Sequence, residues 1–243
     1  MINPQLAKPL YEQIKLYLLT RIEQGEYLPD TRLPSERDLA EQFGVSRLTV
    51  KKAISDLLQS GQVYVQIGKG TYVSRAKIDQ SLDSLTSFSE DIGKRQQRPG
   101  SRVLEAREIQ ASVEEARHLR VSPGAPLYLL RRVRLADDKP MAIESCRIVA
   151  ALCPGLLSEH DYERESLYQV LRGEYGIRLA YAEQSIEARL AGTDEAALLQ
   201  MEARAPILDI SRVTYTDTNQ PVEYTLSAYC GARYKFQAIL RRV

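Results

Sequence analysis

The sequence predicts an α+β protein that is divided into two domains. Apolar residues recur at helical spacing in the first part of the chain, whereas alternating and β-rich segments dominate the rest. The length of 243 residues suits two domains. A polar stretch of the kind that connects domains, SRAKIDQSL, lies between the two regions. We therefore expect a helical domain at 1–75, a linker at 76–82 and a sheet domain at 83–243.

The composition is that of an ordinary globular protein, with 44% hydrophobic and 27% charged residues. The apolar runs are far shorter than the ~20 residues that cross a bilayer, and the N-terminus lacks a signal pattern. These features predict a cytoplasmic protein with no membrane partner. Three cysteines without CxxC spacing and only two histidines, His118 and His160, predict no disulfide framework, no metal site and no cofactor.

The first 75 residues contain three candidate helices. Apolar spacing predicts one helix at 9–24. A second helix begins after Ser35, where Asp38 three residues later resembles a capping box, and it ends at Gly44, a typical C-terminal glycine. A third helix begins immediately afterwards at Ser46, which is a natural N-cap.

The second and third helices, joined by a short turn, form a helix-turn-helix pattern. In such a pair, the first residues of the second helix enter the major groove of DNA. The net charge over 1–75 is only +2, but the stretch 44–55 contains three cations and no acid. The candidate DNA contacts in this helix are Ser46, Arg47, Thr49 and Lys51.

A β-hairpin is predicted after the third helix. Two runs of β-forming residues, at 63–67 and 71–73, flank the turn Gly68-Lys69-Gly70. A glycine at the tip lets the backbone approach a groove, and Lys69 can meet a phosphate. Taken singly, cations on a helix are usually a solvated face, and a glycine-rich tip is commonly only a turn. Their order and spacing together favour double-stranded DNA as a partner.

Four motifs in this region resemble the GntR family of bacterial regulators. They are PLYxQI at 9–14, LPSERxLA at 33–40, FGVSRxTVKxA at 43–53 and GxGTYV at 68–73. The resemblance implies a winged helix-turn-helix whose wing glycine enters the minor groove. Asp30 stands where the family often has glycine, and Lys51 stands where arginine is commoner. The DNA-binding residues that the resemblance implies are Arg37, Arg47 and Gly70, and Ser35 at the start of the second helix is a further candidate.

The rest of the chain predicts an antiparallel sheet with short helices. Strands are expected at 102–109, 127–135, 142–149, 177–188, 207–216 and 222–229. Helices are expected at 112–119, 166–175 and 193–200, each started by a Ser or Thr N-cap. Helices between strand pairs without a βαβ rhythm are typical of an α+β domain. The segments that begin near Ser112 and Thr193 look alike and indicate a duplicated unit.

Five motifs in this second region resemble the UTRA domain of the GntR branch typified by the histidine-utilisation regulator. They are LxSFSED at 85–91, RxR at 132–134, PxAxE at 140–144, SLY at 166–168 and PVEY at 221–224. Two other branches fit less well, since one carries an all-helical sensor and the other a much larger aminotransferase-like domain. The resemblance implies a fold similar to chorismate lyase that binds an effector instead of catalysing a reaction.

The resemblance also implies where an effector binds. In relatives that sense sugar phosphates, the corresponding residues surround the anionic group, and arginines, hydroxyls and a helix start suit an oxyanion. That set is Phe88, Ser89, Arg132, Arg134, Ser166 and Tyr168. The candidates for binding the rest of the ligand are Glu144, Glu223 and Tyr229. As the alternative, the two arginines are surface charges paired with glutamates, and the glutamates lie at a rim.

Together these patterns predict a homodimeric regulator of transcription, most simply a repressor, with operator DNA and a small anionic effector as partners. A sugar phosphate is the first choice of effector. An enzyme is one rival, because the implied sensor fold resembles a lyase, but the sequence shows no nucleophile–base pair. A DNA-binding architectural protein without a ligand is the other rival. The chain reads CGARY at 230–234 where many relatives have RGDRY, so the effector cannot be taken from a relative.

Overall fold

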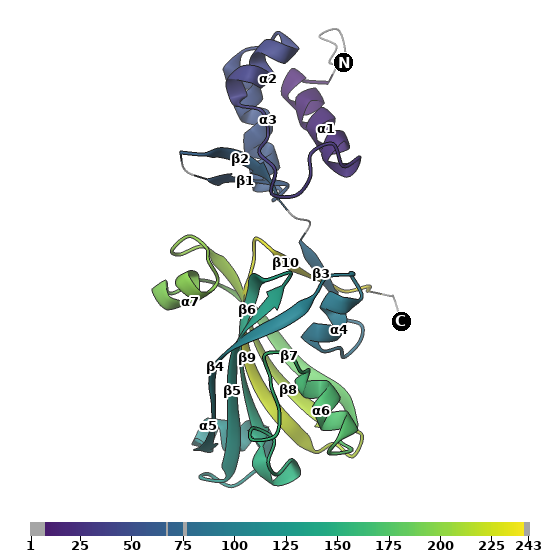
Figure 1. The fold of residues 1–243 in the computed structure, drawn as a ribbon, viewed down its shortest axis with the longest axis vertical. Coiled ribbons are helices and arrows are strands. Elements are labelled where there is room, and N and C mark those ends of the chain that lie inside the picture. The colour runs from purple at the N-terminus through teal and green to yellow at the C-terminus, as the bar shows by residue number, and fades with distance from the viewer. Residues whose placement is uncertain (1–7, 67, 75–76, 241–243) are drawn as a thin grey trace. The chain divides into compact units, whose positions relative to one another are not determined.

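The computed structural model describes residues 8–66, 68–74 and 77–240 (Figure 1). The chain divides into two compact units, Met1–Lys77 and Ile78–Val243. Each unit has a hydrophobic core of its own. Among the described residues, no helix combines the length and the apolar character that crossing a bilayer requires.

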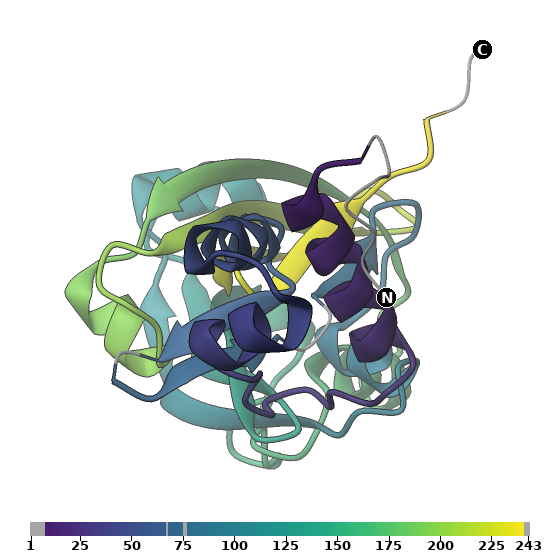
Figure 2. The same ribbon diagram turned by 90° about the horizontal axis from the view of Figure 1, so that it is seen from above.

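The N-terminal unit is a winged helix-turn-helix, as predicted. Its elements are α1 (Leu10–Glu23), α2 (Glu36–Phe43), α3 (Arg47–Gln59), β1 (Val63–Gln66) and β2 (Gly70–Val73). Helix α3 packs against both α1 and α2 (Figure 2). The apolar stripes recognised in the sequence form this core. Its fully buried side chains include Ile14, Leu18, Leu39, Val50 and Leu57.

The caps of α2 and α3 define the turn between them. The Ser35 hydroxyl accepts a hydrogen bond from the Asp38 N–H, and the Asp38 carboxylate accepts one from the Ser35 N–H, so the predicted capping box is confirmed. Gly44 ends α2 with a φ of 64°, a left-handed conformation that is costly for residues with a Cβ. Ser46 then caps α3 by accepting a hydrogen bond from the Thr49 N–H.

The wing formed by β1 and β2 is joined to the loop that precedes α2. The Asp30 N–H donates to the Val73 carbonyl, and the Val73 N–H donates to the Thr31 carbonyl. The loop therefore adds a strand-like edge to the hairpin. Asp30 has a φ of 63°, a conformation that aspartate tolerates better than most residues, which accounts for its place at a position where glycine is common. The predicted first strand extended to Ile67, which lies outside the described residues.

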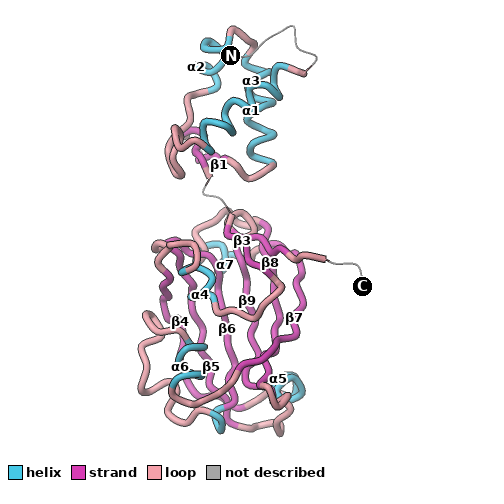
Figure 3. The backbone as a smooth tube through the Cα atoms, turned by 90° about the vertical axis from the view of Figure 1, so that its right-hand side faces the viewer, coloured by secondary structure: helices cyan, strands magenta, loops and turns pink. Residues whose placement is uncertain are grey.

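The C-terminal unit is built on a six-stranded sheet whose strands run alongside one another in Figure 3. The strand order is β4-β5-β6-β9-β8-β7, and every neighbouring pair is antiparallel. A short 3-10 turn, η1 (Ala150–Leu152), follows β6. The predicted α+β class and all six predicted strand segments are confirmed. The strands are β4 (Pro99–Gln110), β5 (Pro126–Ala136), β6 (Lys139–Val149), β7 (Leu179–Leu190), β8 (Pro206–Thr216) and β9 (Pro221–Cys230).

The sheet consists of two halves with the same topology. Each half has a long outer strand, a short helix and then a hairpin. The first half is β4, α5 (Val113–Leu119), β5 and β6, and the second half is β7, α7 (Thr193–Leu198), β8 and β9. The halves meet at the β6–β9 pair in the middle of the sheet. This arrangement confirms the duplicated unit that the sequence indicates.

Helices cover both faces of the sheet (Figure 1). Helices α4 (Phe88–Gly93) and α6 (Leu167–Gly173) pack on one face. Helices α5 and α7 pack on the other face, at opposite ends. Because side chains alternate along a strand, β5 directs Arg132 and Arg134 to the α4/α6 face and Val133 to the α5/α7 face.

The expected linker at 76–82 is wrong over most of its length. Residues Ile78–Ser81 form β3, which pairs in parallel with β10 (Tyr234–Gln237) and belongs to the C-terminal unit. Ile78 and Gln80 alternate into the interior, with 5% and 4% exposure. The sequence indicates a linker here because the segment is rich in polar residues, and sequence alone does not distinguish a buried glutamine from a solvated one.

The helix starts in the C-terminal unit also differ in part from expectation. Helix α4 was not predicted, although Ser87 and Glu90 form a complete capping box at its start. Helix α7 has Gly192 as its N-cap, and Thr193 is its first helical residue. Ser166 is the N-cap residue of α6, but its side chain makes no capping hydrogen bond.

Replacing Gly44 with alanine should destabilise the N-terminal unit by about 1 kcal/mol, because the left-handed conformation is unfavourable for alanine. Steric overlap adds little, since none of the described atoms beyond its chain neighbours lies within 4 Å of a Cβ added at this glycine. Gly44→Asn should lose less, because asparagine tolerates this conformation. Denaturant unfolding followed by circular dichroism measures both differences. Wild-type stability in Gly44→Ala would contradict this account of the turn.

Candidate functional site

Four exposed cations of the N-terminal unit lie on the elements that the sequence assigned to DNA binding. Arg37 is in the first turn of α2, Arg47 is the first residue of α3, and Lys51 follows one turn later. Lys69 is in the turn of the wing, and all four side chains are exposed. In winged helix-turn-helix folds, these are the positions that face the grooves and the phosphates.

Three other predicted DNA contacts have structural roles. The hydroxyls of Ser35 and Ser46 cap α2 and α3, and the Ser46 Oγ lies 2.8 Å from the Thr49 Oγ1. Gly70 has a φ of 119°, and a Cβ added there would lie 2.7 Å from the Arg32 Nε. Arg32 is thus an exposed cation beside the wing. Sequence reasoning missed Arg32 because it lies in a loop outside the helix-turn-helix pattern.

A pocket in the C-terminal unit opens on the sheet face that carries α4 and α6. Its walls come from helices α4 and α6 and from several strands of the sheet, and about 540 Å³ of space, open solvent included, lies among them. Of the nine predicted effector residues, only Ser89 is outside its lining. The eight that line it are Phe88, Arg132, Arg134, Glu144, Ser166, Tyr168, Glu223 and Tyr229.

Two buried arginines of β5 share one carboxylate in this pocket. The Arg132 Nη2 donates to the Glu144 Oε1 at 2.5 Å, and the Arg134 Nη1 donates to the same oxygen at 3.0 Å. Arg132 lies directly opposite Glu144 in the register of β5 and β6. Arg132 is 1% exposed and Arg134 is 4% exposed. The alternative that both arginines are surface charges is therefore wrong, although they do pair with a glutamate.

The shared carboxylate leaves both guanidinium groups incompletely bonded. Within the described part of the chain, the Arg132 Nε and Nη1 and the Arg134 Nε are buried without a hydrogen-bond partner. A buried donor without an acceptor costs about 1–3 kcal/mol, and more when the donor is charged. Such groups are rare in native interiors, and an acceptor supplied by a ligand would remove the cost.

The pocket has an excess of positive charge at neutral pH. Burial alone would raise the pKa of Glu144, but the guanidinium groups of Arg134 and Arg132 outweigh that effect and lower the pKa to about 2. Burial raises the pKa of Glu223, and the nearby charge of Glu144 raises it further. The charged lining residues are three arginines and two glutamates. The excess is therefore at least one positive charge, even when both glutamates are ionised.

A second polar cluster lies on α6, β8 and β9. The Tyr168 hydroxyl donates to the Glu223 Oε1 at 2.5 Å, and the Thr214 hydroxyl donates to the same oxygen at 3.0 Å. The Glu223 Oε2 and the Thr225 Oγ1 are buried and have no hydrogen-bond partner among the described residues. Glu223 is 2% exposed, so it is not a rim residue. Its second oxygen is suited to accept a hydrogen bond from a ligand hydroxyl or amine.

The remaining predicted residues hold the arginines or close the pocket. The Arg134 guanidinium lies 4.6 Å from the centre of the Phe88 ring, and its Nη2 donates to the Ser89 Oγ at 3.2 Å. Ser89 therefore orients Arg134 and does not line the cavity itself. Ser166 is buried in the wall, and the ring of Tyr229 packs against Tyr234 behind it.

Sequence reasoning missed Arg212, a third arginine of the pocket, on β8. The duplication contained the signal for it. Both β5 and β8 begin at a proline that follows an alanine, and each contains an Arg-Val pair at the same distance from that proline. Arg212 in the second half therefore corresponds to Arg132 in the first half. The register agrees, since Arg132 lies opposite Glu144 on β6 and Arg212 lies opposite Thr225 on β9.

Gln80 also lines the pocket and was missed, because it belongs to the segment expected as a linker. Its side-chain carbonyl accepts a hydrogen bond from the buried Tyr234 hydroxyl at 2.9 Å. Its position in the wall depends on the pairing of β3 with β10, which joins residues 78–81 to residues 234–237. A polar stretch read alone contains no signal for such a distant pairing.

The chemistry of the lining suits binding. Burial raises the pKa of the Cys146 thiol well above its ordinary value, and the charges of Glu144 and Glu223 raise it further, so the thiol stays protonated and is a poor nucleophile. The unpaired guanidinium N–H groups offer donors to an anion. The oxygens of Glu223 and Thr225 that have no partner among the described residues can accept hydrogen bonds from hydroxyls or amines elsewhere on the ligand.

Comparison with known proteins identifies the family. Residues 10–73 match "Bacterial regulatory proteins, gntR family", and residues 94–235 match the UTRA domain. The chain is 41% identical over 242 residues to the HTH-type transcriptional repressor NagR of Bacillus subtilis, which covers 100% of this chain and 99% of that protein. It is 35% identical over 232 residues to the HTH-type transcriptional repressor PhnF of Mycolicibacterium smegmatis. That match covers 95% of this chain and 93% of that protein.

A solved structure supports the same assignment over both domains. The crystal structure of PhnF from Mycobacterium smegmatis matches with a TM-score of 0.69 at 32% identity, covering 94% of this chain and 99% of that one. The two resemblances stated from the motifs are thereby confirmed, and the relatives are repressors and not enzymes. The chain belongs to the GntR family of transcription regulators, in the branch of repressors that carry a UTRA domain.

Proposed function

We propose that this regulator is a homodimeric repressor whose affinity for operator DNA is controlled by a sugar phosphate bound in the C-terminal unit. The observation that carries the proposal is the pair of buried arginines, Arg132 and Arg134, with N–H groups that lack an acceptor among the described residues. A phosphate group presents several strong acceptor oxygens, and guanidinium groups bind it through paired hydrogen bonds. Because the protein acts on operator DNA, a cytoplasmic location is part of the proposal.

The other polar groups of the pocket suit the sugar portion. Glu223 and Thr225 each have an oxygen with no partner in the described part of the chain, which can accept from a ligand hydroxyl or amine, while Tyr168 holds the Glu223 carboxylate in place. Tyr229 and Phe88 provide the apolar surface against which a sugar ring packs.

On the DNA side, we assign the start of α3 to the major groove and the wing to the adjacent backbone and minor groove. Arg47 and Thr49 would meet base edges, while Arg37 and Lys69 would meet phosphates. Lys51 is a point charge and is less suited to bidentate contact than arginine. A dimer would present two such helices to half-sites about 34 Å apart.

The effector can control DNA binding only if its affinity differs between two arrangements of the protein. The walls of the pocket include Gln80 of β3 and Phe88 of α4. These two elements are the first that follow the connection from the N-terminal unit. A ligand that orders β3 and α4 therefore acts on the part of the sensor from which the DNA-binding unit extends.

Replacing Arg47 with alanine should weaken specific operator binding by about 1–3 kcal/mol for each half-site, roughly 5- to 150-fold, because a base contact is lost. Electrophoretic mobility shift with the operator and with unrelated DNA measures the loss. Arg117→Ala removes the same charge from an exposed position on α5 and should bind like the wild type. Unchanged operator affinity in Arg47→Ala would remove this residue from the DNA contact.

Replacing Arg134 with alanine should leave operator binding intact but abolish the response to the effector. The reason is that the anion of the ligand loses the Arg134 N–H donor, which has no acceptor among the described residues. Thermal shift against hexose phosphates and amino-sugar phosphates, each with its dephosphorylated form, finds the ligand. The wild-type midpoint should rise with ln(1 + [L]/Kd), and removal of the phosphate should cancel the rise.

The matched control for this experiment is Arg131→Ala, which removes an arginine from the same strand but from the face opposite the pocket, beside Glu195. It should keep the ligand response. A full response in Arg134→Ala, or hits confined to unphosphorylated compounds, would refute the phosphate cradle while leaving the DNA-binding assignment untouched.

A further inference from the structure

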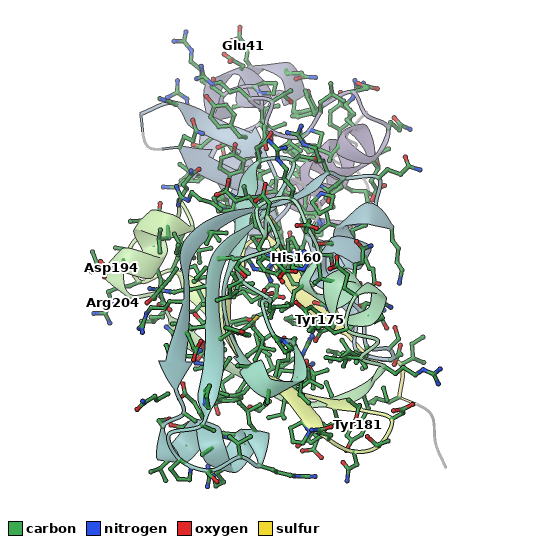
Figure 4. All side chains as sticks on the ribbon, turned by 60° about the horizontal axis from the view of Figure 1, so that its bottom comes forward. Glu41, His160, Tyr175, Tyr181, Asp194 and Arg204 are labelled. Carbon is green, nitrogen blue, oxygen red and sulfur yellow. The ribbon has the colours of Figure 1, made fainter. Side chains whose placement is uncertain are left out.

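The two outer strands of the C-terminal sheet differ in how their free edges are covered. Strands β4 and β7 each have 12 residues and lie at opposite edges of the sheet (Figure 3). Figure 4 labels Tyr181, near the start of β7, and Asp194, just beyond its end. An outer strand presents a row of unpaired backbone N–H and C=O groups, which natural proteins usually cover or interrupt.

The edge of β4 is protected along its first part. The strand begins with Pro99, which has no N–H group, and its register shifts between Val103 and Glu105. Glu163, in the loop ahead of α6, covers the stretch before this shift. Its backbone carbonyl accepts a hydrogen bond from the Ser101 N–H at 3.1 Å, and its Oε1 accepts one from the Val103 N–H at 3.2 Å. The chain itself therefore closes this part of the edge.

The edge of β7 is open. The Ala191 N–H donates to the Ala205 carbonyl, just ahead of β8, at 3.0 Å. Because the backbone groups of alternate residues point to opposite sides of an antiparallel strand, the even-numbered residues of 182–190 direct theirs away from β8. Across the described ranges, no other strand, helix or loop bonds to these outward groups, and the Leu190 carbonyl accepts a 3.5 Å hydrogen bond from the adjacent Arg189 side chain. Strand β7 also contains no proline or lysine.

The side chains of β7 divide sharply by face. The even-numbered ones lie on the α4/α6 face, where Gln184 contacts Arg212 and Ile186 packs against the cluster that contains Phe88. These even-numbered side chains carry no charge. The odd-numbered ones lie on the α5/α7 face and include two acids and one base, and pairs with Glu195 and Asp209 hold the base, Arg189, at this face. The residues of the odd-numbered set are Glu183, Ser185, Glu187 and Arg189.

Antiparallel pairing with a second copy suits this pattern when it is centred on Ile186. Residues 182–190 of both copies then overlap, and Glu183 lies opposite the partner's Arg189. Moving the centre by one residue in either direction places a glutamate opposite a glutamate, which is destabilising. A centre at Ala188 restores a pair of opposite charges but overlaps only residues 186–190. The charges of the strand therefore favour the longer pairing about Ile186.

We propose that β7 is the strand through which two copies of this chain pair, so that their sheets join edge to edge about a twofold axis. The inference rests on the homodimer of the proposed function and names its interface. A twofold interface uses the same surface on both copies, and each β7 supplies the N–H and C=O groups that the other lacks. The second copy is thus a partner that satisfies the outward backbone groups of both strands at once.

The proposed interface reaches the effector pocket through one strand. The Gln184 Oε1 accepts a hydrogen bond from the Arg212 Nε at 2.9 Å, and Arg212 lines the pocket. Gln184 is also one of the residues whose backbone would pair with the second copy. A ligand that repositions Arg212 would therefore act on a residue of the interface.

Light scattering coupled to size-exclusion chromatography of the full-length chain without DNA tests the interface. The wild type should elute with twice the mass of one chain. Ala188→Pro should weaken dimerisation by about tenfold or more, because it removes an outward N–H from each copy while leaving the pairing with β8 intact. Ala106→Pro is the matched control, since Ala106 is an exposed alanine on β4 whose N–H also points outward. It should dimerise like the wild type.

A disulfide test covers the case in which Ala188→Pro fails to fold. In the proposed register Ile186 lies opposite its own copy at about 5.5 Å between Cα atoms, a separation that a disulfide spans. Ile186→Cys should therefore form a cross-linked dimer with oxidised glutathione on a non-reducing gel. Ala188→Cys should not, because Ala188 lies opposite the partner's Gln184. The native cysteines are buried and should not cross-link.

The outcomes separate the interface from the proposed function. A monomeric wild type would overturn both this interface and the proposed homodimer. A dimer that Ala188→Pro leaves unchanged, that Ile186→Cys does not cross-link, or that Ala106→Pro disrupts instead would overturn the β7 interface alone.

Discussion

The burial of two arginines behind one carboxylate is the constraint on which the C-terminal unit depends. Arg132 and Arg134 stay inside the protein because Glu144, on the neighbouring strand, lies within hydrogen-bond distance of both. Breaking a buried ion pair typically costs about 3–5 kcal/mol, so the register of β5 and β6 and the identity of Glu144 are tightly coupled. The carboxylate satisfies only part of the two guanidinium groups. Guanidinium N–H groups without an acceptor would destabilise a purely structural core. In a binding site for an anion, the same N–H groups are the donors that the ligand uses.

The duplication of the sheet explains how this imbalance arises. The two halves place equivalent arginines, Arg132 and Arg212, on either side of the central β6–β9 pair. In the first half the residue opposite the arginine is Glu144, whereas in the second half it is Thr225. The glutamate of the second half, Glu223, is instead bonded to hydroxyls of α6 and β8. Two similar frameworks thus produce an asymmetric pocket, with donors in excess on one side and acceptors on the other.

The sequence predicted the elements that carry their own local signals. Periodic apolar stripes, the Ser35 box and the Gly44 turn define the helix-turn-helix, and the six long strands alternate clearly. It failed where burial comes from distant pairing: β3 and its Gln80 depend on β10, and the polar letters of that stretch look solvated. Eight of the nine residues expected to bind an effector line the pocket, and seven of these eight lie in the family motifs. Arg212 was missed because the two halves were compared by their order of helices and strands, and their residues were not aligned one by one.

The position of α4 and α6 links the pocket to the rest of the sensor. Each helix contributes a lining residue, Phe88 from α4 and Tyr168 from α6, and an ion pair between Glu90 and Arg172 joins them. If the proposed ligand contacts both helices and Gln80, it would order them together with β3. Under the proposed function, the order of β3, the first element after the connection at Lys77, would be what distinguishes an occupied pocket from an empty one. Differential order of this kind is sufficient for allosteric control without any contact between ligand and DNA-binding residues.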